Sequence, residues 1–108
     1  MTVTHADRGE PFHNPHYRVG SLPLDPFVVQ LVDTDGRPRS LQKYDRVELH
    51  TEGLPAGTTS VYDAQQGIIT HTWTERFTEA GVFMVQARLH SGERVDFAPP
   101  IAVVVEQP

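Results

Sequence analysis

The chain has 108 residues, of which 38% are hydrophobic and 21% charged, a composition typical of one globular domain. Its net charge of −5 offers no basic surface for nucleic acid, and no run approaches the ~18 apolar residues of a membrane span. It contains no cysteine, which excludes disulfide bonds and thiolate metal sites.

The N-terminal segment, residues 1–24, differs from the remainder. It contains three prolines and three of the six histidines, and it shows neither helical nor strand periodicity. We therefore expect an extended arm over residues 1–24, followed by a single domain over residues 25–108. The segment has no basic start and no apolar run, so no secretory signal peptide is expected.

From residue 27 onward, short strand patterns alternate with turn signals. Strands are expected over residues 27–32, 46–50, 60–62, 68–73, 82–89, 94–97 and 101–105. Turns are expected at DTDG, GLPAG and DAQQG, because aspartate and glycine tolerate the backbone conformations of tight reversals. No amphipathic helix pattern is present. These features predict an all-β sandwich of seven to eight short antiparallel strands.

Alternation of side-chain character indicates which residues form the core. Over residues 82–89 one phase is apolar and the other polar, so one face should be buried and one solvated. The apolar phase contains Phe83, Val85, Ala87 and Leu89, and the polar phase contains Gln86, Arg88 and His90. We expect Phe83 to lie at the centre of the sandwich beside Trp73. The same rule places Val47, Leu49, Ile69, Val103 and Val105 inside.

Several segments, taken together, resemble one protein family. GRPRSL follows the aspartate-rich turn, DAQQG precedes IITHTW, and EAGVF opens the long strand. In this order and spacing, the chain resembles, over about residues 26–106, the immunoglobulin-like domain of phage baseplate upper proteins and many phage minor tail and virion proteins. Immunoglobulin-type domains in general usually have a cysteine where Val85 stands, and the family pattern has an aromatic residue where His71 stands. The resemblance implies an immunoglobulin-like β-sandwich with the extended N-terminal arm.

The resemblance also implies a function. It points to a non-enzymatic bacteriophage virion structural protein, assembled in the host cytoplasm and attached as a head decoration or as a tail or baseplate component. Capsid, tail or baseplate subunits would be its partners, with the N-terminal arm as the contact and with a homo-oligomer as an open alternative. No nucleic acid or membrane partner is expected. The alternative function is a host-surface adhesion or carbohydrate-binding module.

Few residues offer catalytic or metal-binding chemistry. There is no Gly-x-Ser-x-Gly elbow and no cysteine, so no catalytic residue and no enzymatic activity are expected. Asp33 and Asp35 resemble the start of a calcium loop, but no glutamate follows at the twelfth position and Gly36 favours a hairpin turn. The third and weakest hypothesis is a metal-dependent enzyme that uses the arm histidines, in which His13 and His16 bind one metal and either His5 or Asp7 completes the site. We expect no metal site and no cofactor.

The remaining histidines and the tyrosines complete the candidates. His50 and His90 are expected in solvent, whereas His71 is expected to be packed or hydrogen-bonded. Tyr17, Tyr44 and Tyr62 offer an aromatic sugar-binding patch, but scattered tyrosines in a sandwich more often lie at the rim of the core.

Overall fold

The computed structural model describes residues 3–6, 15–33 and 35–108. These residues form nine strands and no helix, which confirms the all-β prediction. The strands are β1 (Val3–Ala6), β2 (His16–Arg18), β3 (Phe27–Leu31), β4 (Arg46–His50), β5 (Gly57–Asp63), β6 (Ile68–Trp73), β7 (Gly81–Ser91), β8 (Arg94–Phe97) and β9 (Ile101–Glu106). Strands β3 to β9 correspond to the seven expected ranges, whereas β1 and β2 lie in the segment expected to be a strandless arm.

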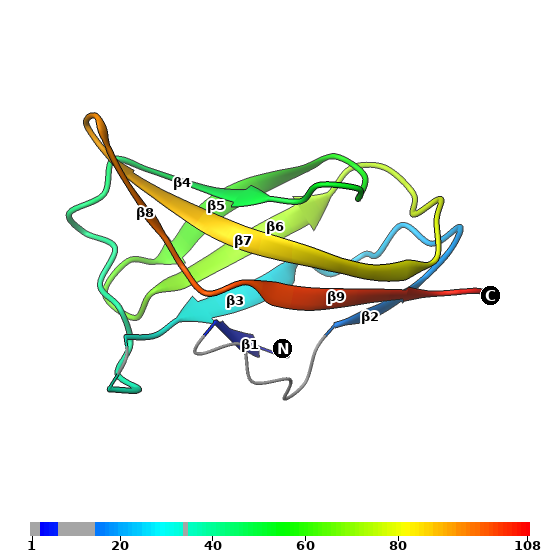
Figure 1. Cartoon of the computed structure of the whole chain (residues 1–108), viewed down its shortest axis with the longest axis horizontal. Coiled ribbons are helices and arrows are strands. Elements are labelled where there is room, and N and C mark those ends of the chain that lie inside the picture. The colour runs from blue at the N-terminus through cyan, green and yellow to red at the C-terminus, as the bar shows by residue number, and fades with distance from the viewer. Residues whose placement is uncertain (1–2, 7–14, 34) are drawn as a thin grey trace.

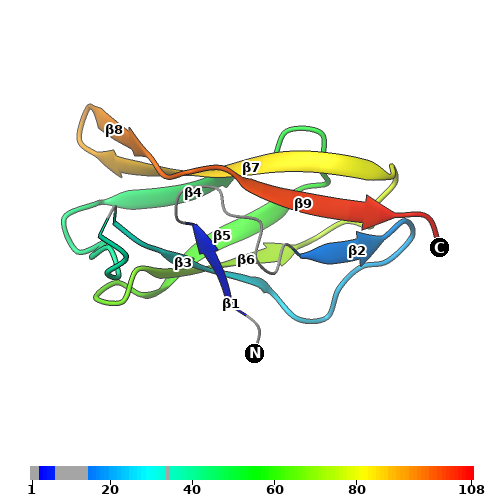
Figure 2. The ribbon, with the colours of Figure 1, turned by 60° about the horizontal axis from the view of Figure 1, so that its bottom comes forward.

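The strands form two sheets that lie over one another (Figures 1 and 2). The first sheet has the order β1-β3-β6-β5, and the second has the order β2-β9-β7-β4 with β8 also paired to β7. The long strand β7 pairs with β9 through its first half and lies between β4 and β8 through its second half. The β7–β8 hairpin therefore extends beyond the body of the sandwich, as Figure 1 shows.

The sequence predicted that all the strands would be antiparallel, but two of the pairings are parallel. Among the described pairings, β1 runs parallel to β3 and β2 runs parallel to β9, while the other five are antiparallel. Both parallel strands come from residues 1–24. Strand β2 is held at its ends as well, because Pro15 O accepts from Val104 N at 3.0 Å and Val19 N donates to Glu106 O at 2.9 Å. Residues 15–19 are thus part of the sandwich, and residues 7–14 lie outside the described residues.

The core lies between the two sheets and follows the predicted alternation. The positions predicted to be inside are buried: Val47, Leu49, Ile69, Trp73, Val85, Ala87, Leu89, Val103 and Val105. On β7, however, the polar phase is partly buried rather than solvated, because β4 and β8 flank this strand on both sides. Long side chains on a strand with two neighbours cover one another and lose contact with water.

The predicted position of Phe83 is wrong. Its side chain is only partly buried, and a Cβ atom at Gly53 would lie 3.0 Å from its ring, so Phe83 covers the 51–56 loop at the edge of the core. The aromatic residue beside Trp73 is instead Phe77, which is 1% exposed and has its ring centroid 5.1 Å from that of Trp73. Phe77 lies in the connection between β6 and β7, where no strand alternation marks it as a core residue.

Two predicted turns are confirmed, and glycine has a steric reason at one of them. After β3, Asp33 N donates to Arg37 O at 2.8 Å, and Val32 and Pro38 form an antiparallel bridge, as expected for a hairpin. Between β5 and β6, Gly67 has φ +69°, and a Cβ atom there would lie 2.7 Å from Leu31 O. Only glycine fits this conformation and this close approach of two backbone segments.

Candidate functional site

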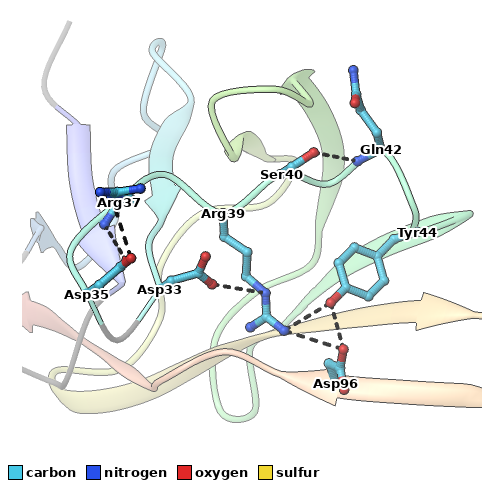
Figure 3. Close-up of polar contacts among 8 residues, drawn as sticks. All are labelled: Asp33, Asp35, Arg37, Arg39, Ser40, Gln42, Tyr44 and Asp96. Carbon is cyan, nitrogen blue, oxygen red and sulfur yellow. Dashed lines mark hydrogen bonds and ion pairs between the residues drawn. The ribbon is translucent and has the colours of Figure 1, made fainter.

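A cluster of charged and hydroxyl side chains joins the β3–β4 connection to β8 (Figure 3). Tyr44 and Arg39 come from this connection, and Asp96 comes from β8. The Tyr44 hydroxyl donates to Asp96 Oδ2 at 2.6 Å, and Arg39 Nη2 donates to the Tyr44 hydroxyl at 3.0 Å. Burial and the neighbouring Asp96 carboxylate raise the pKa of Tyr44. A phenol whose pKa is raised is a weaker acid and keeps its proton at neutral pH, so Tyr44 can donate to Asp96 and the cluster acts as a clamp between the β3–β4 connection and β8.

The two aspartates that resemble a calcium loop each lie near an arginine. Asp33 Oδ1 lies 3.9 Å from Arg39 Nε, and Asp35 Oδ2 lies 3.7 Å from Arg37 Nε. Figure 3 shows Arg39 between Asp33 on one side and Tyr44 and Asp96 on the other. Both pairs are long and lie at the surface, so each contributes little to stability. The described residues contain no group of three or more potential metal ligands.

His71 is packed and hydrogen-bonded, as predicted. It is 3% exposed, and its Nδ1 lies 2.8 Å from Thr59 Oγ1. The Leu49 N–H donates to the same Oγ1 at 3.1 Å, so the Thr59 hydroxyl links the His71 ring to the backbone of β4. Burial lowers the pKa of His71 to about 4. Gly57 provides the space for this ring, because a Cβ atom there would collide with His71 Nε2.

The other histidines differ in their environments. His50 is exposed as predicted, but His90 is not: its side chain is 15% exposed, and Nε2–H donates to Glu48 Oε1 at 2.9 Å. This bond is the main cause of the lowered pKa of the Glu48 carboxyl. Of the proposed arm ligands, His16 lies 3.3 Å from Glu106. Asp7 and His13 lie outside the described residues, and the structure does not describe the side chain of His5. The metal hypothesis therefore stays a prediction.

The three tyrosines do not form one patch. Tyr17 packs against Trp73 and Phe77 at the edge of the core, with ring centroids 5.7 and 4.7 Å away. Tyr44 belongs to the clamp with Asp96. Tyr62 is exposed on β5, in the other sheet. An aromatic platform for a sugar needs rings side by side, and these three side chains do not provide one.

An apolar area covers part of the outer face of the second sheet. Val82 and Met84 of β7 are 66% and 53% exposed, and their cross-strand neighbours on β9 are Val104 and Ala102. We call these four residues the outer apolar area. Val82 and Met84 are exposed and the other two are partly exposed, and exposed apolar patches, when large and contiguous, often mark a contact surface.

Sequence alternation missed the outer apolar area, although the sequence contained a signal for it. Residues 82–85, VFMV, are apolar in both phases, which is typical of a strand covered on both faces. In the structure one face of this stretch meets the core, and the other is open. Further along the same sheet, the exposed Phe97 of β8 lies under the Arg88 guanidinium, 5.8 Å from the ring centroid.

Comparison with known proteins gives no assignment: no protein-family model matches the chain, and no curated protein matches it. In the described part of the chain, no helix is long and apolar enough to cross a membrane. The function must therefore follow from the fold, the buried groups and the surface of this chain.

Proposed function

We propose that this chain is a non-enzymatic structural module of a bacteriophage particle, an immunoglobulin-like sandwich attached to other virion proteins. Strand order supports the immunoglobulin-like part. Immunoglobulin constant-type domains have strands A, B, E and D in one sheet and C, F and G in the other. Here the first sheet has the spatial order β1-β3-β6-β5, which corresponds to A-B-E-D. In the second sheet, β4, β7 and β9 correspond to C, F and G.

The core is consistent with assembly in a reducing compartment. In antibody domains a disulfide joins strands B and F. The corresponding strands here are β3 and β7, whose Val29 and Val85 are fully buried. An aliphatic core needs no oxidation, so the domain can fold in a bacterial cytoplasm before particles are released. The fold departs from the antibody pattern in three respects. Trp73 lies on β6 rather than on the strand that corresponds to C, β1 runs parallel to β3, and β2 and β8 are additional strands of the second sheet.

The observation that carries the attachment function is the outer apolar area. In the proposed particle, Val82 and Met84 are covered by an apolar surface of a neighbouring virion protein. Burying apolar surface of this kind contributes roughly 25 cal/mol per Å² before the costs of association are subtracted. Strand β2 pairs with β9 of its own chain, so residues 16–18 are not free to extend to a partner. The proposed contact therefore lies on the sheet face rather than on that part of the expected arm.

Mass spectrometry of purified particles of the virus that encodes this chain tests the proposal. The chain should be present, and a Met84→Glu variant should fold but be lost from the particles, because a buried carboxylate needs a partner. Thr72→Glu is the matched control, since Thr72 is exposed on the other sheet and should be retained. Absence of the wild-type chain from particles would overturn the proposal. Binding to the host envelope in place of particles would favour the adhesion alternative.

A further inference from the structure

Arg88 is a partly buried arginine whose side chain has no polar partner in the described part of the chain. It points outward from β7, where its cross-strand neighbours are Glu48 of β4 and Phe97 of β8. Its Nε is shielded from solvent, and among the described residues no group bonds or ion-pairs with its side-chain nitrogens. Polar groups shielded from water almost always have a partner. Arg88 therefore lacks an acceptor that the described chain does not supply.

The neighbouring carboxylate, Glu48, is committed to another residue. Its Oε1 accepts from His90 Nε2 at 2.9 Å. The bond with His90 is the main cause of the lowered pKa of Glu48, and the positive charges of Arg46 and Arg88 contribute less. Glu48 therefore stays ionised and attracts Arg88 from a distance, but it does not bond the guanidinium.

Phe97 orients the Arg88 guanidinium. The guanidinium carbon lies 5.8 Å from the Phe97 ring centroid, and Phe97 is 57% exposed. Stacking on an aromatic face holds the planar guanidinium without using its hydrogen-bond donors. A side chain that is already oriented loses less conformational freedom when a partner binds. The pair is thus preorganised to receive an acceptor.

Exposed apolar side chains lie on the same sheet face as this arginine. Val82 and Met84 precede it on β7, and Val95 and Phe97 lie on the neighbouring β8. They are four of the eight large apolar side chains that are exposed in the described residues, so half of these gather on one face. Arg88 lies about 13 Å beyond Met84 along the strand. Aromatic residues, methionine and arginine are enriched in protein interfaces, and this face combines all three.

Building on the proposed function, in which this face is the contact surface, we propose that its partner is a protein surface that sets an aspartate or glutamate carboxylate against Arg88. Apolar side chains of the same partner surface cover Met84 and Phe97. Charge complementarity selects this chemistry. A neutral partner would leave a buried, unpaired cation, whereas a carboxylate accepts two parallel N–H bonds from a guanidinium.

The charge distribution disfavours other occupants. The outward side of the second sheet carries three arginines and two glutamates, Arg18, Arg46, Arg88, Glu48 and Glu106. This excess of positive charge is too small for a phosphate backbone or an anionic lipid surface, which take several basic residues. The whole chain has 14 acidic and nine basic residues, so a second copy would approach with like charge. A protein with an acidic residue within an apolar patch fits the face best.

The amount of each variant in purified particles, measured by mass spectrometry, tests the carboxylate separately from the apolar contact. Arg88→Gln removes the charge and should lower this amount at least about tenfold, because truncating one member of a buried charge pair weakens binding strongly. Arg94→Gln is the matched control, since Arg94 is exposed in the opposite phase of β8, and it should be retained. Equal melting temperatures of the isolated proteins would show that both variants fold.

The outcomes distinguish this proposal from the proposed function. Retention of Arg88→Gln together with loss of Met84→Glu would overturn the carboxylate contact and leave the virion role standing. Absence of the wild-type chain from particles would overturn both. Binding of the isolated chain to phosphatidylglycerol vesicles, or its dimerisation in sedimentation, would also overturn the proposal if Arg88→Gln abolished it, because Arg88 would then serve a different partner.

A zero-length cross-link identifies the acidic group. Arg88→Lys keeps the positive charge, and a carbodiimide joins the new amine to a carboxylate in contact with it as an amide. The cross-link should lead to an aspartate or glutamate of another virion protein, whereas Arg94→Lys should give none. Exchanging the charges, with Arg88→Glu here and arginine at that acidic position, should restore the incorporation that Arg88→Glu alone loses. Cross-links confined to this chain, or failure of the exchanged pair, would overturn the proposal.

Discussion

Tyr17 of β2 stacks on Phe77, with ring centroids 4.7 Å apart and ring planes at 16°. The two segments are also joined through their backbones, because Gly20 N donates to Phe77 O at 2.7 Å and Phe77 N donates to Ser21 O at 3.0 Å. Burial raises the pKa of the Tyr17 phenol. The N-terminal segment and the β6–β7 connection thus close the end of the core together, although neither shows a regular pattern in sequence.

Truncation of Phe77 should destabilise the domain more than truncation of Phe83. Phe77→Ala should lower the free energy of unfolding by about 3–5 kcal/mol, the range for a fully buried aromatic side chain. Phe83→Ala should cost less than half as much, because Phe83 is only partly buried. Urea denaturation of both variants measures the difference. The opposite order would show that Phe83, as the sequence pattern predicted, is the central aromatic residue.

Acid should destabilise the protein through His71. Burial lowers the pKa of His71 from 6.5 to about 4, so between these pH values the unfolded chain binds a proton that the folded chain does not. Its contribution is fully present above pH ~6.5 and is lost as the pH falls towards ~4, a total of roughly 3 kcal/mol. Urea midpoints measured at several pH values follow this loss.

The His71→Phe variant is the control for this pH dependence, because it keeps a ring in the core without a titrating group. Its stability should fall less between pH ~6.5 and ~4.5, whereas losses at lower pH, from carboxyls such as Glu48, should persist. An unchanged slope in the variant would assign the pH dependence to other groups.

Two glycine substitutions distinguish the energetic cost of a left-handed backbone conformation from the cost of a steric clash with the new Cβ atom. Gly67→Ala combines a positive φ of +69° with a Cβ atom 2.7 Å from Leu31 O, and Gly92→Ala has a similar φ of +62° with open space around it. Gly92→Ala should cost about 1–2 kcal/mol from the left-handed conformation alone. Gly67→Ala should cost distinctly more, because two backbone segments must move apart. Thermal melting of both proteins gives the comparison, and equal losses would contradict the steric argument.

The hydrogen bond between Tyr44 and Asp96 should contribute measurably to stability. Tyr44→Phe removes this donor at 2.6 Å together with the acceptor of the Arg39 bond, and should cost at least the ~0.5–1.5 kcal/mol typical of one hydrogen bond. Tyr62→Phe is the matched control, because Tyr62 is 61% exposed, and it should be nearly neutral. Urea denaturation measures both variants, and a neutral Tyr44→Phe would mean that water replaces the bond without loss.

The sequence pattern was most informative where strands have one buried and one open face. Alternation placed Val47, Leu49, Val103 and Val105 correctly, because the period of two in a strand is a local property. The Asp33–Gly36 hairpin was equally predictable, since the residues that tolerate a tight turn are few. In both cases the physical cause lies within a few residues of the position concerned.

Alternation failed where a second strand or a loop decides the environment. His90 is shielded because Glu48 stands on the adjacent strand β4, and Phe77 is buried because Tyr17 covers it from a segment sixty residues earlier in the chain. No local pattern records such pairings. The His71 site is intermediate: its burial was expected, but its partner Thr59 and the space left by Gly57 depend on the β5–β6 register.

By itself, the sequence determined an all-β chain, seven of its strands, the turns that follow β3 and β5 and most of its core, because each follows from local periodicity and turn chemistry. Only the tertiary structure decided the parallel pairing of β1 and β2, the position of Phe77, the open apolar face around Met84 and the position of Arg88 over Phe97. These features depend on which segments meet across the two sheets. That choice is set by the burial and hydrogen bonding of the whole chain, which no short stretch of sequence contains.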